Sequence, residues 1–371
     1  MSTLCLNMIV KNESHIIRET LEHLTAILHF DYWVISDTGS SDNTPEIISD
    51  FFQEKSIPGE IHHDEWKNFG WNRSQALSYC ENKTDYVFFW DADDRFDGSF
   101  VLPDLTHDTY FVKFTSVDKS LAYRRKLIVR NNGNYFWRGV LHEFITEHDK
   151  NFTTGTIEGN YGVISGRFGA RSQLKDKYLL DARALEQALA SAEDEDLKPR
   201  YAFYCGQSYR DAGMPEKAIE WYLKRAEMGG WKEEAMYSYM QAGLQYEKLN
   251  NEALAIHCWL RGMEIQPERA ECAYHLARLN RWKGRPMIAM VFAQQAKRVT
   301  PPEHGLQVSK AIYSFWIDYE VAHNSQAAGD FMTGKQACQR VLANSAAPDN
   351  IRNTCRELIK KYDAAMNSVR N

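Results

Sequence analysis

Short apolar runs and longer amphipathic segments alternate through the first half of the chain. Runs typical of β-strands cover residues 4–10, 32–36, 86–90 and 110–114, and helix-compatible segments separate the first three runs. Such alternation is typical of strand–helix–strand units, in which successive strands lie parallel to one another. The pattern predicts an α/β fold with a mostly parallel sheet.

Two of the intervening segments carry helix signals. Residues 44–53 follow a cluster of Ser, Asp and Asn and have Pro45 in their first turn, which favours a helix start. Residues 15–30 gather their apolar side chains on one broad face, as an amphipathic helix does. We expect both segments to be crossover helices. The apolar face of the first consists of Ile16, Ile17, Leu21, Leu24, Ile27 and Leu28.

After about residue 174 the strand-like runs give way to long helical patterns. Residues 206–209 (Gly-Gln-Ser-Tyr) recur as residues 243–246 (Gly-Leu-Gln-Tyr), about 37 positions later, and a weaker third copy begins at Ala277. A period near 34 is that of tetratricopeptide helix hairpins, in which small residues let paired helices approach closely. The pattern predicts an all-α repeat domain, and an irregular helical bundle is the open alternative.

Length and composition narrow the class of protein. At 371 residues the chain is long enough for two cores, and we place the domains at residues 1–173 and 174–371. The 44 Lys and Arg residues against 50 Asp and Glu residues leave a net charge of −6, which offers no overall attraction to nucleic acid or anionic membrane.

Seven scattered cysteines without a Cys-x-x-Cys pair indicate reduced thiols in a cytoplasmic protein. Without a signal peptide or a membrane-spanning run, we expect a soluble chain.

The apolar run at residues 86–90 ends in an acidic cluster, Asp91, Asp93 and Asp94. Carboxylates at the carboxyl end of a parallel strand lie where open α/β sheets bind ligands. An Asp-x-Asp pair offers oxygen ligands to a hard divalent cation that carries a phosphate. The motif therefore suits a nucleotide diphosphate substrate, although a solvated acidic turn explains it equally well.

Two further polar clusters follow the first and second predicted strands. Glu13 comes after the first strand, and Asp37, Gly39 and Asp42 come after the second. Because the ends of parallel strands meet at one edge, we expect these clusters to converge with the acidic motif. Asp37 and Glu13 are candidates to accept hydrogen bonds from a nucleoside, and Gly39 permits a tight turn and close approach of the backbone to the donor. We interpret Asp42 as a cap for the helix near residue 44.

Several charged residues outside the strand ends are candidates for chemistry. Arg73 lies near a predicted helix start and is placed to meet a phosphate, with a surface ion pair as the alternative. Glu143 is a candidate base, and the adjacent His142 is a candidate to bind the cation or orient that base. Arg167 and Arg171 lie in residues 166–173, which form either a flap over a diphosphate or an ordinary linker.

With these motifs in view, residues 2–166 resemble family 2 glycosyltransferases of the GT-A fold. The likeness rests on three ordered motifs, at residues 7–13, 37–42 and 89–94. The whole chain looks like the subgroup that attaches a tetratricopeptide domain behind the transferase domain, as bacterial peptide S-glycosyltransferases of the sublancin type do.

The resemblance implies a nucleotide-sugar donor, usually a uridine diphosphate sugar, together with Mn²⁺ or Mg²⁺. On this basis Glu13 and Asp37 bind the nucleoside, Asp91 contacts ribose or sugar, and Asp93 holds the metal. One departure is Asp94, where the subgroup often has Glu.

For the acceptor side, the resemblance implies that His142 and Glu143 occupy the place of the subgroup's His-Glu pair. Glu143 is then the base of an inverting transfer. A second departure is that no later histidine stands near residues 163–166, so the metal rests on fewer protein ligands.

Two other functions stay open at this point. A nucleotidyltransferase also uses paired aspartates, but its glycine-rich loop is missing from residues 11–14. A non-catalytic repeat scaffold with a vestigial transferase half is the other alternative. The acceptor is open among peptide or protein, glycan, small metabolite and modified nucleic acid, and the helical domain is a candidate surface for acceptor, partner or oligomer contacts.

Overall fold

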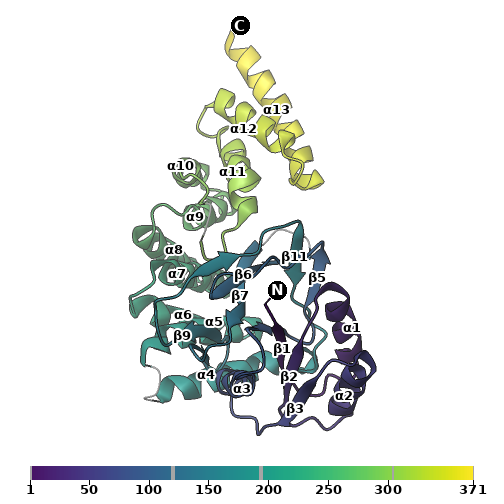
Figure 1. Cartoon of the computed structure of the whole chain (residues 1–371). Helices are drawn as coiled ribbons and strands as arrows, with labels where there is room; N and C mark the ends of the chain where they lie inside the picture. The colour runs from purple at the N-terminus through teal and green to yellow at the C-terminus, as the bar shows by residue number, and fades with distance from the viewer. Residues whose placement is uncertain (1, 118–121, 192–194, 303–304, 371) are drawn as a thin grey trace. The chain divides into compact units, whose positions relative to one another are not determined.

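The computed structural model of the chain describes residues 2–117, 122–191, 195–302 and 305–370 (Figure 1). The chain divides into two compact units, residues 1–197 and 198–371. The first unit combines a large sheet with helices, and the described residues of the second are helical or lie in turns and loops. This order confirms the predicted class, an α/β domain followed by an all-α domain. The domain boundary predicted after Gln173 stays a prediction.

Four parallel strands form one side of the main sheet, in the order β3-β2-β1-β4. Helix α1 joins β1 to β2, α2 joins β2 to β3, and α3 joins β3 to β4, since parallel neighbours require such crossovers. The predicted strands and crossover helices of this region are confirmed, and β3 is an addition that the sequence pattern did not reveal. Their bounds are β1 Leu4–Val10, α1 Ile17–Ile27, β2 Tyr32–Asp37, α2 Thr44–Lys55, β3 Gly59–His63, α3 Phe69–Ser78 and β4 Tyr86–Phe89.

The other side of the sheet is mixed. Strand β7 pairs antiparallel with both β4 and β6, and the order continues through β11 to β5. Strands β8 and β9 form a separate antiparallel pair. The bounds are β5 Arg95–Gly98, β6 Thr109–Thr115, β7 Ala122–Arg130, β8 Tyr135–Arg138, β9 Phe144–Glu147, β10 Thr154–Thr156 and β11 Tyr161–Ile164, followed by η1 Ala170–Gln173, α4 Lys177–Ala190 and η2 Glu195–Leu197.

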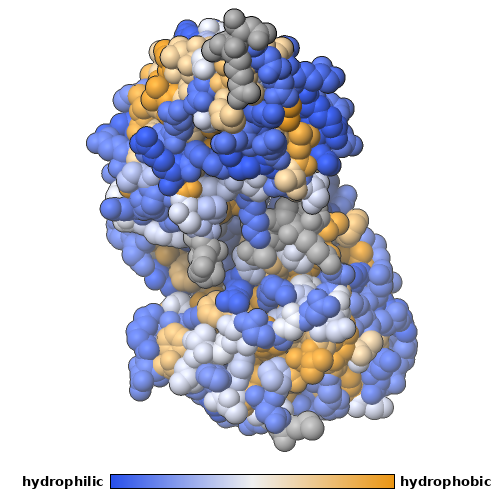
Figure 2. Space-filling model, turned by 90° about the horizontal axis from the view of Figure 1, so that it is seen from above, coloured by the Kyte–Doolittle hydropathy of each residue, from blue (hydrophilic) through white to orange (hydrophobic). Residues whose placement is uncertain are grey.

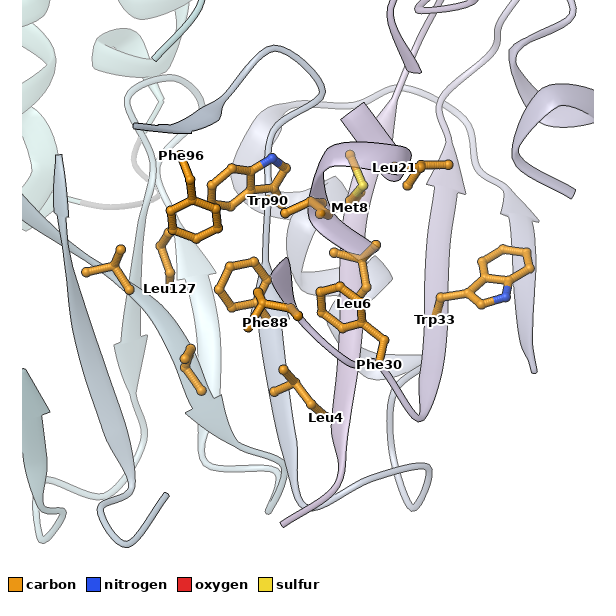
Figure 3. Packing of buried hydrophobic residues seen from close by; sticks show 14 of the residues in the cluster. Leu4, Leu6, Met8, Leu21, Phe30, Trp33, Phe88, Trp90, Phe96 and Leu127 are labelled. Carbon is orange, nitrogen blue, oxygen red and sulfur yellow. The ribbon is translucent and has the colours of Figure 1, made fainter. Parts of the chain in front are cut away.

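Strand β1 is buried on both faces, which explains its nearly continuous apolar sequence. Leu4, Leu6 and Met8 point into the core that α1 covers (Figure 3), while Cys5 packs in a second cluster on the opposite face. The polar exception is Asn7, whose side-chain amide donates to the Val34 and Ala76 carbonyls at 3.3 and 2.9 Å. Its hydrogen bonds satisfy the amide inside the core and tie the strand to its neighbours.

The second unit is a succession of helices, each packed against the next in the chain. Two glycines related by the predicted repeat lie at helix crossings. A Cβ atom on Gly206 would lie 2.7 Å from the Tyr222 ring, and one on Gly243 would lie 2.4 Å from the Trp259 ring. The pairing of glycine with an aromatic ring therefore recurs in space as it does in sequence. The bounds are α5 Lys198–Asp211, α6 Pro215–Glu227, α7 Lys232–Lys248, α8 Glu252–Ile265, α9 Glu271–Trp282, α10 Pro286–Lys297, η3 Ile312–Trp316, α11 Ile317–Asn324, α12 Phe331–Ala343 and α13 Asp349–Arg370.

All seven cysteines are buried and carry free thiols, as the sequence predicts. Within the described residues, every helix is too short or too polar to cross a membrane. Figure 2 shows one face of the molecule, where hydrophobic residues form patches between hydrophilic ones.

Candidate active site

Hydrogen bonds join the polar loops that follow β1 and β2. The Asn12 side-chain oxygen accepts from the Ser41 N–H at 2.7 Å, and the Glu13 N–H donates to the Thr44 hydroxyl at 2.8 Å. Asp42 accepts from the N–H groups of Thr44 and Ser14, so it supports the start of α2 as predicted, while the N-cap position itself is Asn43. Burial raises the pKa of Asp42, but these hydrogen bonds outweigh it and lower the pKa to about 2.

Asp37, the last residue of β2, is a buried carboxylate that organises the following turn. It accepts from the N–H groups of Gly39 at 3.3 Å and Ser40 at 3.1 Å, and His63 Nδ1 lies 3.4 Å away. Gly39 has φ +95°, a conformation that favours glycine and agrees with the predicted turn, and its close approach to a donor stays a prediction. Nucleoside binding by Asp37 stays a prediction, and the exposed His63 ring at the end of β3 is the nearby group that the sequence pattern did not single out.

The acidic motif after β4 meets the loop after β1 through one segment of backbone. Gly169 N–H donates to Asp93 Oδ2 at 3.3 Å, and Ala170 N–H donates to both oxygens of Glu13 at 3.2 Å. Burial raises the pKa of Glu13 to about 7, the Ala170 N–H opposes that rise, and the charge of Asp93 adds to it. The predicted convergence of the strand ends is therefore present, with two carboxylates held side by side.

Arg73 connects two other predicted residues. Its Nε lies 2.7 Å from Glu143 Oε1 and its Nη2 lies 2.5 Å from Asp91 Oδ1, while the guanidinium stacks over the Trp137 ring. The three charged side chains are 8%, 10% and 28% exposed, in the order Arg73, Glu143, Asp91. Arg73 thus forms ion pairs with two carboxylates. Its contact with a phosphate stays a prediction.

Backbone contacts position the turn that carries Glu143 beside Arg73. Asn68 caps α3 by accepting from the Trp71 N–H, and Gly70 N–H donates to the Gly139 carbonyl at 3.0 Å. A Cβ atom on Gly70 would lie 2.5 Å from that carbonyl oxygen, so glycine is needed for the close approach. The start of α3 and the turn that carries Glu143 therefore form one supported unit.

The sequence pattern pointed to Asp94 but not to Arg125, its neighbour in this cluster. Arg125 extends from β7 to within 3.5 Å of Asp91 Oδ2 and 3.9 Å of Asp94 Oδ2. Asp94 is 1% exposed, and its Oδ1 has no hydrogen-bond partner among the described residues. Burial, with the charge of Asp91 adding to it, raises the pKa of Asp94 to about 8. In the sequence, the signal for Arg125 was the basic run at residues 124–126, which lies inside a strand that the apolar pattern did not reveal.

The charges of this cluster alternate along a chain of contacts from Glu143 through Arg73, Asp91 and Arg125 to Asp94. Burial raises the pKa of Asp91, but the two arginines outweigh it and lower the pKa to about 2. Asp91 therefore stays ionised at neutral pH, between two guanidinium groups.

The remaining predicted residues lie at the borders of this cluster. His142 is exposed, with φ 54°, in the turn between β8 and β9. Arg171 pairs with Asp181 of α4, and its guanidinium lies 4.9 Å from the centre of the Phe69 ring. Metal binding by His142 and donor binding by Arg171 stay predictions.

A divalent cation fits the oxygen chemistry of Asp93 and Glu13. No group of three His, Cys, Asp or Glu side chains is gathered as a metal site within residues 2–117, 122–191, 195–302 and 305–370. Mg²⁺, however, is commonly held by one or two carboxylates together with substrate phosphates. The half-exposed Asp93 and its neighbour Glu13 match that smaller ligand set.

Comparison with known proteins assigns the region that contains Glu13, Asp37 and the acidic motif to a protein family. Residues 5–107 match the family model of glycosyl transferase family 2, so the first unit contains a domain of this family. The match includes Glu13, Asp37, Arg73 and the acidic motif, and it ends before Glu143. No curated protein matches the sequence.

Three solved structures illustrate the likeness of the two units. TarS residues 1–349 from S. aureus, in complex with UDP-GlcNAc, is 12% identical with a TM-score of 0.36, and the alignment covers 71% of this chain and 92% of that one. MamA is 14% identical with a TM-score of 0.34, over 52% of this chain and 91% of that one. The C-terminal part of a TPR repeat-containing protein from Cytophaga hutchinsonii is 12% identical with a TM-score of 0.38, over 52% and 74%. At such low scores the assignment rests on the family model, the strand order and the paired helices. Together these confirm the predicted order of a family 2 domain with an α/β sheet followed by an all-helical domain, and the tetratricopeptide likeness of the helices stays a prediction.

Proposed function

We propose that this protein transfers a sugar from a uridine diphosphate sugar to an acceptor, with inversion at the anomeric carbon and with a divalent cation at Asp93. The observation that carries the proposal is the meeting of the β1, β2 and β4 ends within the family 2 domain. There, Glu13 and Asp93 accept hydrogen bonds from consecutive N–H groups. Ligands of open α/β sheets bind at this edge, outside the carboxyl ends of the strands.

The donor is expected to lie across these three strand ends. Asp37 and Glu13 would face the nucleoside, and Asp91 would face the ribose or sugar. Bound at Asp93, Mn²⁺ or Mg²⁺ would offset negative charge on the diphosphate. Arg125 contributes a further positive charge beside Asp91 and is 31% exposed, so it is accessible to a bound donor.

Glu143 is the proposed base. Arg73 Nε lies 2.7 Å from Glu143 Oε1, and this contact fixes the orientation of the Glu143 carboxylate. The acceptor nucleophile loses its proton to Glu143 and forms a bond to the anomeric carbon. In the same displacement the bond from that carbon to the diphosphate oxygen breaks, and the nucleotide leaves. Holding donor and acceptor in line supplies much of the rate enhancement.

The test is calorimetric titration of uridine nucleotides and nucleotide sugars into the protein, with and without Mn²⁺. We expect Mn²⁺-dependent binding of a uridine diphosphate sugar by the wild type and its loss in Asp93→Asn. Asp104→Asn, at an exposed carboxylate, serves as the matched control and should bind normally. Equal Mn²⁺-dependent binding by Asp93→Asn would contradict the metal assignment, and absence of nucleotide binding by the wild type would favour a scaffold role.

A further inference from the structure

A cavity of about 400 Å³ lies in the first unit, between the end of β11 and the start of α4. Its wall contains three cationic side chains, Arg167, Lys175 and Lys177, and three hydroxyl groups, from Ser165, Ser172 and Tyr178. No carboxylate lines it. A volume of this order lies within the range of about 300–1,000 Å³ typical of ligand sites.

The three cations are available to a ligand. None of them forms an ion pair with any carboxylate that the structure describes. Lys177 Nζ lies 3.5 Å from Ser172 Oγ and 5.6 Å from the centre of the Tyr178 ring, and its charge acts at longer range on Asp181. The nearby Arg171 behaves differently, because it pairs with Asp181 and stacks on Phe69. Its contacts hold the η1 turn, and the turn presents Ser172 to the cavity.

One residue of the cavity wall packs against the acidic motif. Gly166 lines the cavity, and a Cβ atom placed on it would lie 2.0 Å from the Asp93 carbonyl oxygen. Ser165, also in the wall, interacts with the Asp94 side chain. The wall of the cavity is therefore joined to the segment that carries Asp93, although Asp93 itself does not line it.

We propose that this cavity binds a phosphate group of a substrate. Two lysine ammonium groups, an arginine fork and three hydroxyl donors match an oxyanion with several acceptor oxygens. A carboxylate ligand would use fewer of these donors. The phosphate chemistry follows from the cavity alone, whereas its assignment to the donor diphosphate, rather than to a phosphate carried by the acceptor, rests on the proposed function.

The test is titration of inorganic pyrophosphate into the full chain in metal-free buffer with a chelator. We expect the wild type to bind and the double variant Lys175→Ala/Lys177→Ala to bind at least about tenfold more weakly, because two charged contacts are lost. The matched control is Lys55→Ala/Lys361→Ala, which removes the same charge at two sites outside the cavity and should stay within about twofold of wild type, as expected for screened, distant charges. Equal affinity in the two double variants, or no binding by the wild type, would overturn the proposal.

Competition then identifies the source of the phosphate. If pyrophosphate displaces uridine diphosphate, the cavity holds the donor diphosphate, and if both bind together it holds a phosphate of the acceptor. Asp93→Asn separates this proposal from the proposed function, because it should bind metal-free pyrophosphate as tightly as wild type or more tightly, since a neighbouring negative charge is removed. If Asp93→Asn loses Mn²⁺-dependent donor binding but keeps pyrophosphate binding, the cation at Asp93 and the phosphate cavity act independently of each other.

Discussion

Two buried arginines of the helical unit differ from a buried carboxyl group of the α/β unit in how fully each is paired. In the helical unit Arg225 is 1% exposed and donates to Glu234, Gly229 and Trp231, and Arg269 is held by Glu233 and Glu271. In the α/β unit, by contrast, Asp94 is as deeply buried, with one carboxylate oxygen that no described group satisfies.

This difference separates charges that maintain the fold from charges that are kept for chemistry. When the hydrogen bonds of a buried ion pair are all made, a bound ligand can stabilise its charges little further. A buried carboxyl group with a raised pKa is in a high-energy environment when ionised, and such groups concentrate at functional sites. The contrast supports the placement of the active site in the α/β unit at the end of β4.

The largest expected effect is on catalysis. Glu143→Gln keeps an oxygen to accept from Arg73 but cannot take a proton, so we expect transfer to fall by about 10²–10⁴-fold with donor binding retained. Release of uridine diphosphate measures transfer, calorimetry measures donor binding, and a thermal melt checks the fold. Full transfer activity in this variant would place the base at another residue.

The next effect is on the stability of the helical unit. Arg225→Met leaves Glu234 buried without its partner, and we expect a loss of about 3–5 kcal/mol in the free energy of unfolding, measured by urea denaturation. The double variant Arg225→Met/Glu234→Leu removes both charges and should recover most of this loss. Donor binding should be unchanged in both. A single variant as stable as wild type would show that the pair is not structural.

The smallest effect concerns the pH dependence of the α/β unit. Asp94 has a pKa of about 8 in the folded protein, above its unfolded value, so its ionisation destabilises the fold increasingly as pH rises from about 4 to about 8. Asp94→Asn removes the ionisable group and should stabilise the protein by about 1–3 kcal/mol at pH 7, with little change at pH 4.

Urea denaturation at both pH values tests this prediction, with the exposed Asp104→Asn as control. Glu13 adds to the wild-type trend with the same sign, because burial raises its pKa to about 7. Stabilisation that is equal at pH 4 and pH 7 would mean that Asp94 is not the group responsible.

The periodicity of the sequence was sufficient for the parallel strands β1, β2 and β4 and for the helices between them. It did not reveal β3 or β7, and in β7 the basic run at residues 124–126 interrupts the apolar pattern of a strand that pairs antiparallel between β4 and β6. Arg125 was missed for this reason, since a residue in an unrecognised strand cannot be assigned to the sheet edge. The glycine–aromatic repeat of the helical unit, in contrast, was visible because it is local and periodic.

The sequence by itself determined where strands β1, β2 and β4 end, because the change from an apolar run to a polar cluster is a local property of the chain. It also carried the family 2 motifs. The tertiary structure alone decided the charge partners. Arg73 and Glu143 are 70 positions apart, and they meet because the start of α3 bonds to the backbone of the β8–β9 turn. Asp94 is buried with Arg125 3.9 Å from its Oδ2 and no described partner for its Oδ1, and such a shortage is a property of three-dimensional burial that no local pattern encodes.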